Sequence, residues 1–202
     1  MTFYFGDILP YMPLLLKALW VSIYVTAAAF IVGSGIGVLL ALAKAGPSKL
    51  LHSISSAYIE VMRNTPLLVQ LYLIYFGLGQ VGLNFDALWS ALIGMTLNNS
   101  AYTAEIFRGG FAAVPAGLRE AGAALGMSSV QTFRYVVFKP GLRAVFPALT
   151  NQFIILFLYS SVGSVISLEE LTSALQHLNS QTLRTLEVFT YGAGLYYATS
   201  AF

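Results

Sequence analysis

The sequence contains no cysteine and only two histidines, so several kinds of chemistry are excluded at the start. Without cysteine there is no disulfide, no thiolate metal ligand and no cysteine nucleophile. His52 and His177 lie far apart, and neither has a second histidine three or four residues away, as a zinc pair on a helix requires. We therefore expect no metal site and no resident cofactor in this chain.

Charged residues are also scarce. Only 9% of the residues are charged, against about a quarter in a soluble domain, while 57% are hydrophobic and the mean hydropathy is +0.76. A bilayer crossing needs about 20 mostly apolar residues, so the chain has room for roughly four to six crossings. We expect a membrane protein that binds lipid and no nucleic acid. The first eight residues contain Asp7 and no basic residue, unlike a secretory leader, so we expect the N-terminus to be retained.

Long apolar runs between turn signals predict an all-α, polytopic membrane protein with about five transmembrane helices, forming a single domain over residues 1–202. The expected spans are, approximately, residues 13–43, 66–83, 85–107, 144–166 and 183–202. An amphipathic segment, 50–62, precedes the second span, and residues 167–181 predict a short surface or re-entrant helix that carries Glu169 and Glu170. The last span reaches Phe202 without a basic or polar tail, so we expect the fifth helix to be cut short.

Two glycines in the first span, Gly33 and Gly37, have the spacing that lets another helix approach closely. A nucleotide-binding glycine loop would need a preceding strand, and no strand pattern precedes them. The pair therefore predicts helix packing.

The basic residues predict the orientation, because cytoplasmic loops of membrane proteins carry an excess of lysine and arginine. With the N-terminus outside, only Lys17 and Arg184 fall outside. The other basic residues fall in the cytoplasm: Lys44, Lys49, Arg63, Arg108, Arg119, Arg134, Lys139 and Arg143.

The polar stretch between the third and fourth spans, about residues 112–141, predicts two short cytoplasmic helices. Residues 117–125 are rich in helix formers, and Gly126 follows where a C-cap glycine belongs. Ser128 and Gln131 have the spacing of a capping box that opens a second helix, and Pro140-Gly141 predicts its end. The residues alone leave two interpretations: a rigid pair of helices that docks on a partner protein, or an interfacial segment that lies on lipid headgroups.

Three motifs resemble those of one family. Glu120-Ala-Gly-Ala-Ala-Leu-Gly-Met-Ser128 closely resembles the Glu-Ala-Ala loop of permease subunits in bacterial ATP-binding-cassette importers. Residues 63–71 (RNTPLLVQL) and 101–109 (AYTAEIFRG) resemble signatures of the polar amino acid branch, and Asn151-Gln-Phe-Ile154 is similar too. The similarity runs in order across nearly the whole chain.

The resemblance implies a permease subunit in a bacterial inner membrane that works with a second permease subunit, two ATP-binding subunits and an external amino acid binding protein. It implies that the cytoplasmic helices are coupling helices that dock on the ATPase through Glu120, Ala121, Gly122, Gly126, Met127 and Ser128. The chain has no Gly-x-x-x-x-Gly-Lys-Ser/Thr phosphate loop, so ATP and magnesium are expected on the partner ATPases and this chain is not expected to be an enzyme.

Polar groups inside spans are costly unless they face a partner or a watery cavity. The candidate substrate contacts are Gln70, Asn98, Asn99, Tyr102, Asn151, Ser160 and Ser161. Hydrogen bonds between helices are the alternative for each of them. Where the family commonly has Lys-Asp-Thr-Ser-Leu, this chain has Leu158-Tyr-Ser-Ser-Val162, without the charge pair. We hypothesise that a different permease subunit supplies that charge in a heterodimer.

Two pairs of charged or titratable residues suggest local roles. Glu105 and Arg108 are three residues apart on one helix face, which favours a local ion pair over a proton relay. Glu170 and His177 in the outer helix are candidates for contact with the binding protein or for a gate. A transporter not driven by ATP and a scaffold subunit of a larger complex remain the alternative functions, because composition alone does not exclude them.

Overall fold

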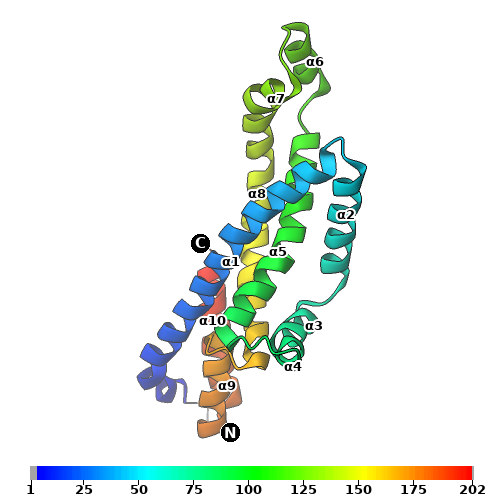
Figure 1. Cartoon of the computed structure of the whole chain (residues 1–202). Coiled ribbons are helices and arrows are strands. Elements are labelled where there is room, and N and C mark those ends of the chain that lie inside the picture. The colour runs from blue at the N-terminus through cyan, green and yellow to red at the C-terminus, as the bar shows by residue number, and fades with distance from the viewer. Residues whose placement is uncertain (1–3, 202) are drawn as a thin grey trace. The chain divides into compact units, whose positions relative to one another are not determined.

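The computed structural model describes residues 4–201, and within these residues all regular structure is helical (Figure 1). The α-helices are α1 (Met12–Ala45), α2 (Lys49–Asn64), α3 (Leu67–Tyr72), α4 (Leu78–Gln80), α5 (Ala87–Ala112), α6 (Ala116–Ala124), α7 (Ser129–Thr132), α8 (Phe138–Tyr159), α9 (Leu171–Thr182) and α10 (Thr185–Ser200). Tighter 3-10 segments are η1 (Phe5–Tyr11) and η4 (Ser160–Ile166), and wider π turns are η2 (Leu73–Gly77) and η3 (Phe133–Val137). The all-α prediction is confirmed.

The chain divides into two compact units. Among the described residues, the first unit comprises the chain up to Phe30, Thr65–Thr96 and the chain from Ile154 onward, and the second comprises Ile31–Asn64 and Leu97–Phe153. The helices α1 and α5 contribute one part to each unit, and so does α8. The single domain over residues 1–202 stays a prediction.

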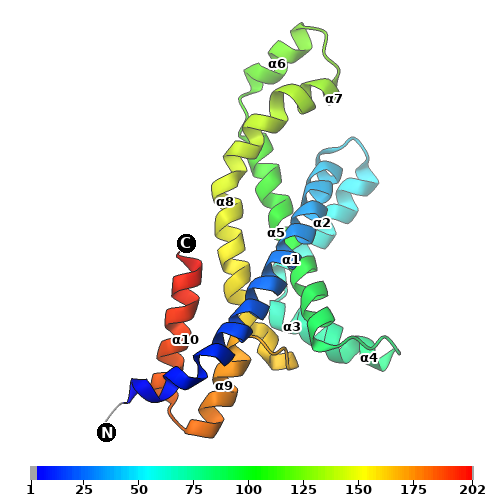
Figure 2. The ribbon, with the colours of Figure 1, turned by 90° about the vertical axis from the view of Figure 1, so that its left-hand side faces the viewer.

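The first unit has two apolar clusters. One joins α1 and α5 to α3 through Val25, Leu71 and Met95, which are almost fully buried. The other joins α1 to α9 and α10 through Leu15, Leu178 and Val188. In Figure 2, α9 and α10 are neighbouring helices, and the turn between them places Leu183 in the left-handed region with φ 56°.

The second unit is built on close packing of α5 against α1 and α8. A Cβ on Gly37 would lie 3.0 Å from backbone atoms of Ser100 and Ala104 on α5, so only glycine fits there. A Cβ on Gly141 would lie 2.6 Å from the ring of Phe111, so α8 and α5 also pack closely. The prediction that the small residues of the first span pack against another helix is confirmed for Gly37.

Two helical stretches among the described residues are long and apolar enough to cross a membrane: Phe5–Ala45 and Ser129–Ile166. They contain the predicted first and fourth spans. The helix α5 has 26 residues, about 39 Å at 1.5 Å per residue, but polar side chains interrupt it. The apolar helix Leu67–Gln80 is shorter than the expected second span, and α10 has 16 residues. The count of five spans stays a prediction.

The expected end of the second cytoplasmic helix at Pro140-Gly141 is wrong. Both residues lie inside α8, and the π turn η3 ends at Val137, three residues before Pro140. Proline lacks an N–H and its ring collides with the carbonyl four residues earlier in a regular α-helix. That carbonyl belongs to Val136 in the wider π turn, which relieves the collision and lets the helix continue. Gly141 is explained by its contact with Phe111 and not by helix termination.

Candidate functional site

The two short helices predicted between the third and fourth spans are present as α6 and α7, joined at Gly126. The N–H of Met127 donates to the carbonyl of Gly122 at 3.0 Å, and that of Gly126 donates to Ala123 at 2.9 Å, as in a Schellman cap. Gly126 has φ 73°, which residues with a Cβ rarely adopt. Ser128 then forms the predicted capping box with Gln131. The two caps fix the angle between two short helices.

This hairpin is tied to the rest of the second unit and leaves one face uncovered. Gly122 packs on Thr132 within the hairpin, and Arg119 donates to the carbonyl of Phe111 on α5 at 2.5 Å. The rings of Phe111 and Phe133 meet edge to face at 5.2 Å. The large apolar side chains left exposed are Leu118, Leu125 and Val130, which are 42%, 80% and 76% exposed.

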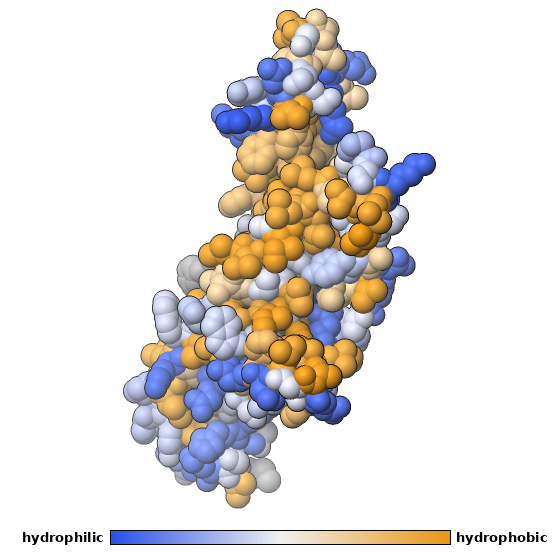
Figure 3. All heavy atoms as spheres, in the orientation of Figure 1, coloured by the Kyte–Doolittle hydropathy of each residue, from blue (hydrophilic) through white to orange (hydrophobic). Residues whose placement is uncertain are grey.

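We call the exposed apolar residues of the hairpin, Leu118, Ala121, Leu125 and Val130, the hairpin face. Glu120 is also exposed and directly precedes Ala121 in α6. Figure 3 shows apolar side chains gathered at the end of the hairpin, with polar ones around them. Of the other coupling residues predicted from the sequence, Gly122 is buried, Met127 is half-buried and Gly126 and Ser128 are exposed. An exposed apolar patch with a polar rim is typical of a protein contact.

The predicted substrate contacts of the second unit lie on α5 and α8. Asn98 and Asn99 are buried on α5, and the amide of Gln152 on α8 donates to Asn99 Oδ1 at 3.2 Å. Tyr102 is half-buried one turn further along α5, and Asn151 is exposed. The Asn99–Gln152 bond is the helix-to-helix hydrogen bond that the sequence left open as an alternative. A role in substrate binding stays a prediction for these residues.

The remaining predicted substrate contacts, Gln70, Ser160 and Ser161, belong to the first unit. The Gln70 side chain is buried and donates to the carbonyl of Thr65 at 3.0 Å, beside the break before α3. Ser160 and Ser161 each donate to the carbonyl three residues earlier, at 2.7 Å. These bonds stabilise local backbone, and binding of substrate by the three residues stays a prediction.

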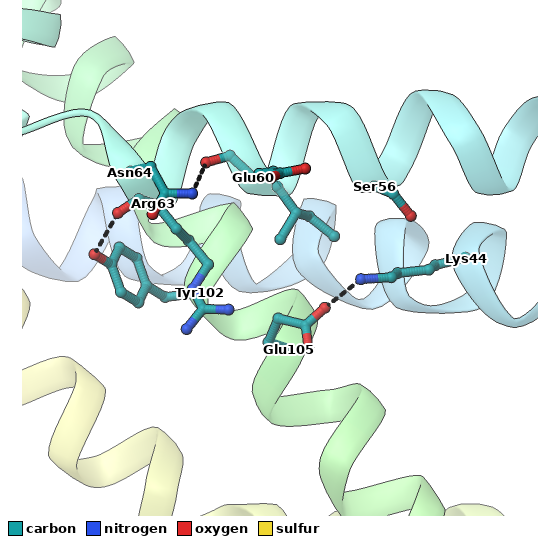
Figure 4. Close-up of a pocket in the computed structure, with 8 residues that line it drawn as sticks. Lys44, Ser56, Glu60, Arg63, Asn64, Tyr102 and Glu105 are labelled. Atoms are coloured by element: carbon teal, nitrogen blue, oxygen red, sulfur yellow. Dashed lines mark hydrogen bonds and ion pairs between the residues drawn. The ribbon is translucent and has the colours of Figure 1, made fainter.

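A polar cavity of about 390 Å³ lies among α1, α2 and α5 of the second unit (Figure 4). It is lined by Lys44, Ser56, Ile59, Glu60, Arg63, Asn64, Tyr102 and Glu105. We call it the α2 cavity. Tyr102 is the only predicted substrate contact that it contains, and its hydroxyl donates to the carbonyl of Arg63 at 3.5 Å.

Ion pairs fix one wall of the α2 cavity. Glu105 pairs with Arg108 at 2.7 Å, which confirms the predicted local pair. Its other carboxylate oxygen pairs with Lys44 on α1, also at 2.7 Å. The side chain of Glu105 is only 17% exposed, so its contact with Lys44 ties α1 to α5 more firmly than a surface pair would.

The outer helix differs in part from its prediction. The residues 171–182 do form a helix, α9, but Glu170 is fully buried and not available to a binding protein. Its carboxylate accepts from the N–H of Ser173 at 2.8 Å and from Tyr196 at 3.0 Å. It caps α9 and joins it to α10. His177 is exposed and lines a second cavity, of about 660 Å³, with Lys17, Asp86 and Glu169.

Sequence reasoning missed three contacts between distant residues: Lys44–Glu105, Ser22–Glu170 and Tyr58–Ser100. A weak signal existed for Glu170, because the helix dipole favours an acidic residue at the start of a helix. No local pattern pairs Lys44 with Glu105, which is 61 positions away.

Comparison with curated proteins finds amino acid permeases along nearly the whole chain. Glutamine transport system permease protein GlnP of Escherichia coli is 34% identical over 97% of this chain and 90% of its own length. Nopaline transport system permease protein NocM of Agrobacterium fabrum is 34% identical over 91% of this chain and 80% of its own length. Octopine transport system permease protein OccM of Rhizobium radiobacter is 42% identical over 69% of this chain, and the match spans 60% of that relative.

Solved structures of amino acid transporters also resemble this chain. A crystal structure of an amino acid ABC transporter with histidines contains a chain 37% identical to this one, with a TM-score of 0.95 over 100% of this chain and 94% of its own. The MetNI methionine ABC transporter, at 24% identity and a TM-score of 0.73, shares the fold. Residues 33–201 match the family described as binding-protein-dependent transport system inner membrane component. The chain belongs to this family of membrane permease components.

Proposed function

We propose that this chain is a transmembrane subunit of an ATP-driven importer, and that it forms part of the translocation path for a polar amino acid. The family and the amino acid permeases among its relatives support this proposal. The observation that carries it for this chain is the hairpin face, a rigid surface of exposed leucines and valine beside Glu120. Such a surface suits docking on a soluble ATPase better than a loop without internal structure would.

The proposal includes an orientation in a bacterial inner membrane. With about five spans and the N-terminus outside, the hairpin lies in the cytoplasm, where ATP is available. The α2 cavity lies on the same side, because Lys44 and Arg63 belong to the basic residues assigned to the cytoplasm. The helix α9 then lies toward the external binding protein.

The full assembly has a second permease subunit, two ATP-binding subunits and an external binding protein, and ATP and magnesium bind to the ATPases. The segment Leu158-Tyr-Ser-Ser-Val162 carries no charge, which supports a different second permease subunit that supplies one. A substrate-bound structure with two copies of this chain and two occupied sites would contradict the heterodimer.

Co-purification tests the docking of the hairpin. The complex would be expressed with a tag on this chain, and the ATPase subunit would be quantified in the purified material. Leu125→Asp places a charge in the hairpin face without disturbing the core, because Leu125 is 80% exposed. We expect the ATPase to be lost from the complex and its stimulation by loaded binding protein to disappear.

Leu183→Asp is the matched control, since Leu183 is 85% exposed and belongs to the other unit. We expect it to retain the ATPase in full. A scaffold subunit or a transporter not driven by ATP would show no stimulation of ATP hydrolysis by loaded binding protein in the wild-type complex, and that result would overturn the proposal.

A further inference from the structure

The α2 cavity contains one cationic and one anionic side chain that have no ion-pair partner among the described residues. These are Arg63 and Glu60, three residues apart on α2. At this spacing on a helix the two side chains often pair, but here they do not. Figure 4 shows both side chains at the cavity, with the guanidinium of Arg63 directed toward Tyr102 and Glu105.

The other charges of the cavity are already neutralised. Glu105 uses one carboxylate oxygen for Lys44 and the other for Arg108, at 2.7 Å each. A ligand with an ammonium group would therefore meet Glu60 as the available carboxylate, and a ligand with a carboxylate would meet Arg63 as the available cation.

Arg63 is oriented for such a ligand. Its guanidinium carbon lies 5.4 Å from the centroid of the Tyr102 ring, within the range of a cation–π contact. That contact is not a hydrogen bond, and the guanidinium has no ion pair among the described residues, so its N–H groups are available. The N–H edge is the part that binds a carboxylate through two parallel hydrogen bonds.

A third polar group in the cavity lacks a partner. The hydroxyl oxygen of Ser56 is buried and has no hydrogen-bond partner among the described residues, and Figure 4 shows it on the side of α2 that faces Lys44. A buried polar atom without a partner is costly, so it indicates a site that a ligand or water completes. The volume of about 390 Å³ lies in the range of small-molecule sites, roughly 300–1,000 Å³.

We propose that the α2 cavity binds a free amino acid as its zwitterion, with the α-carboxylate on Arg63 and the α-ammonium on Glu60. The inference rests on the proposed function, because it adds a site for the transported class of molecule at the cytoplasmic side of this subunit. It also gives this chain its own pair of opposite charges for a zwitterion, separate from the uncharged segment Leu158-Tyr-Ser-Ser-Val162.

The absence of cysteine from this chain allows a local test. Asn64→Cys introduces a single thiol at the cavity, and Ser53→Cys introduces one on an exposed position of the same helix outside it. The complete transporter would be reconstituted in nanodiscs without binding protein, and the rate of maleimide labelling of this chain measured. L-Arginine and L-glutamine are the probes, with agmatine and 4-aminobutanamide, their analogues that lack the α-carboxylate, as comparisons.

We expect both amino acids to slow labelling at the cavity thiol, the two analogues to slow it far less, and none of the four to affect the outside thiol. In the Asn64→Cys chain, Arg63→Gln or Glu60→Gln should raise the half-protecting concentration by about tenfold or more. Arg63→Lys should restore part of the protection, and Arg143→Gln, an exposed arginine outside the cavity, should leave it unchanged.

Two results would overturn the inference: labelling that neither amino acid slows, or protection that agmatine matches and that neither charge substitution weakens. Uptake by the same complexes, supplied with ATP and loaded binding protein, separates the two proposals. A complex that imports amino acid with an unprotected cavity thiol contradicts the cavity site alone. A complex that imports no amino acid contradicts the proposed function.

Discussion

Two glycines on α1, Gly35 and Gly37, have opposite surroundings. A Cβ added to Gly37 would collide with Thr103 and with the backbone of α5, whereas one added to Gly35 would meet nothing within 4 Å. We predict that Gly37→Ala destabilises the chain by about 1–3 kcal/mol, the usual cost of overpacking. Gly35→Ala should be neutral or stabilising by up to about 1 kcal/mol, because alanine favours a helix. Thermal unfolding of the purified chain in detergent measures both, and equal midpoints for the two variants would contradict the packing described here.

A second prediction at this scale concerns the buried carboxyl of Glu170, the N-cap of α9, which contacts α1 and α10. Burial raises its pKa above the ordinary value of 4.5, although hydrogen bonds to Ser173, Tyr196 and Ser22 oppose the shift. Because the folded-state pKa is the higher one, the stability that Glu170 contributes is complete below pH 4.5 and is lost as the pH rises through the raised value.

Glu170→Gln should therefore flatten the fall of the unfolding midpoint between acidic and neutral pH, while keeping the size of the side chain and an oxygen that accepts from the Ser173 N–H. Glu170→Ala should lower the midpoint at every pH, because it leaves the Ser173 N–H without its partner, at about 1–3 kcal/mol, and the Tyr196 hydroxyl with Thr172 alone. Parallel midpoint curves for the wild type and Glu170→Gln would show that the carboxyl does not titrate in this range.

At the scale of elements, the angle between α6 and α7 depends on the left-handed backbone of Gly126. Valine at φ 73° is strained by about 1–2 kcal/mol or more. We predict that Gly126→Val leaves membrane insertion intact but uncouples ATP hydrolysis from uptake, since the hairpin no longer presents its face at the same angle. Gly117→Ala is the control, because Gly117 lies in α6 with ordinary φ and nothing within 4 Å. If Gly126→Val still couples ATP hydrolysis to uptake normally, coupling does not depend on the angle between α6 and α7.

The same hairpin shows which elements local sequence determines. Gly126 and the Ser128–Gln131 box act through bonds a few residues long, so their roles could be predicted from the sequence. The end expected at Pro140 could not, because the π turn before it tolerates proline and Phe111 on another helix requires Gly141. Tertiary packing overrode the local signal there.

At the scale of the whole molecule, the sequence predicted the helical class and the family but not the partners of its polar groups. The Lys44–Glu105 pair joins residues 61 positions apart, and the Ser22–Glu170 bond joins residues 148 apart. Nothing in a local pattern selects such partners, because the fold brings them together. For the same reason, the opposed charges of the α2 cavity emerged only from the structure, although both residues are close together on α2.

Uptake into proteoliposomes tests most directly whether this chain is part of an ATP-driven importer of amino acids. The complete complex would be reconstituted with ATP and magnesium inside, and radiolabelled amino acids would be added outside with the binding protein. We predict accumulation that requires ATP and the binding protein, and that falls to background when this chain carries Leu125→Asp. Accumulation that continues without ATP, or that is unaffected by Leu125→Asp, would contradict the account.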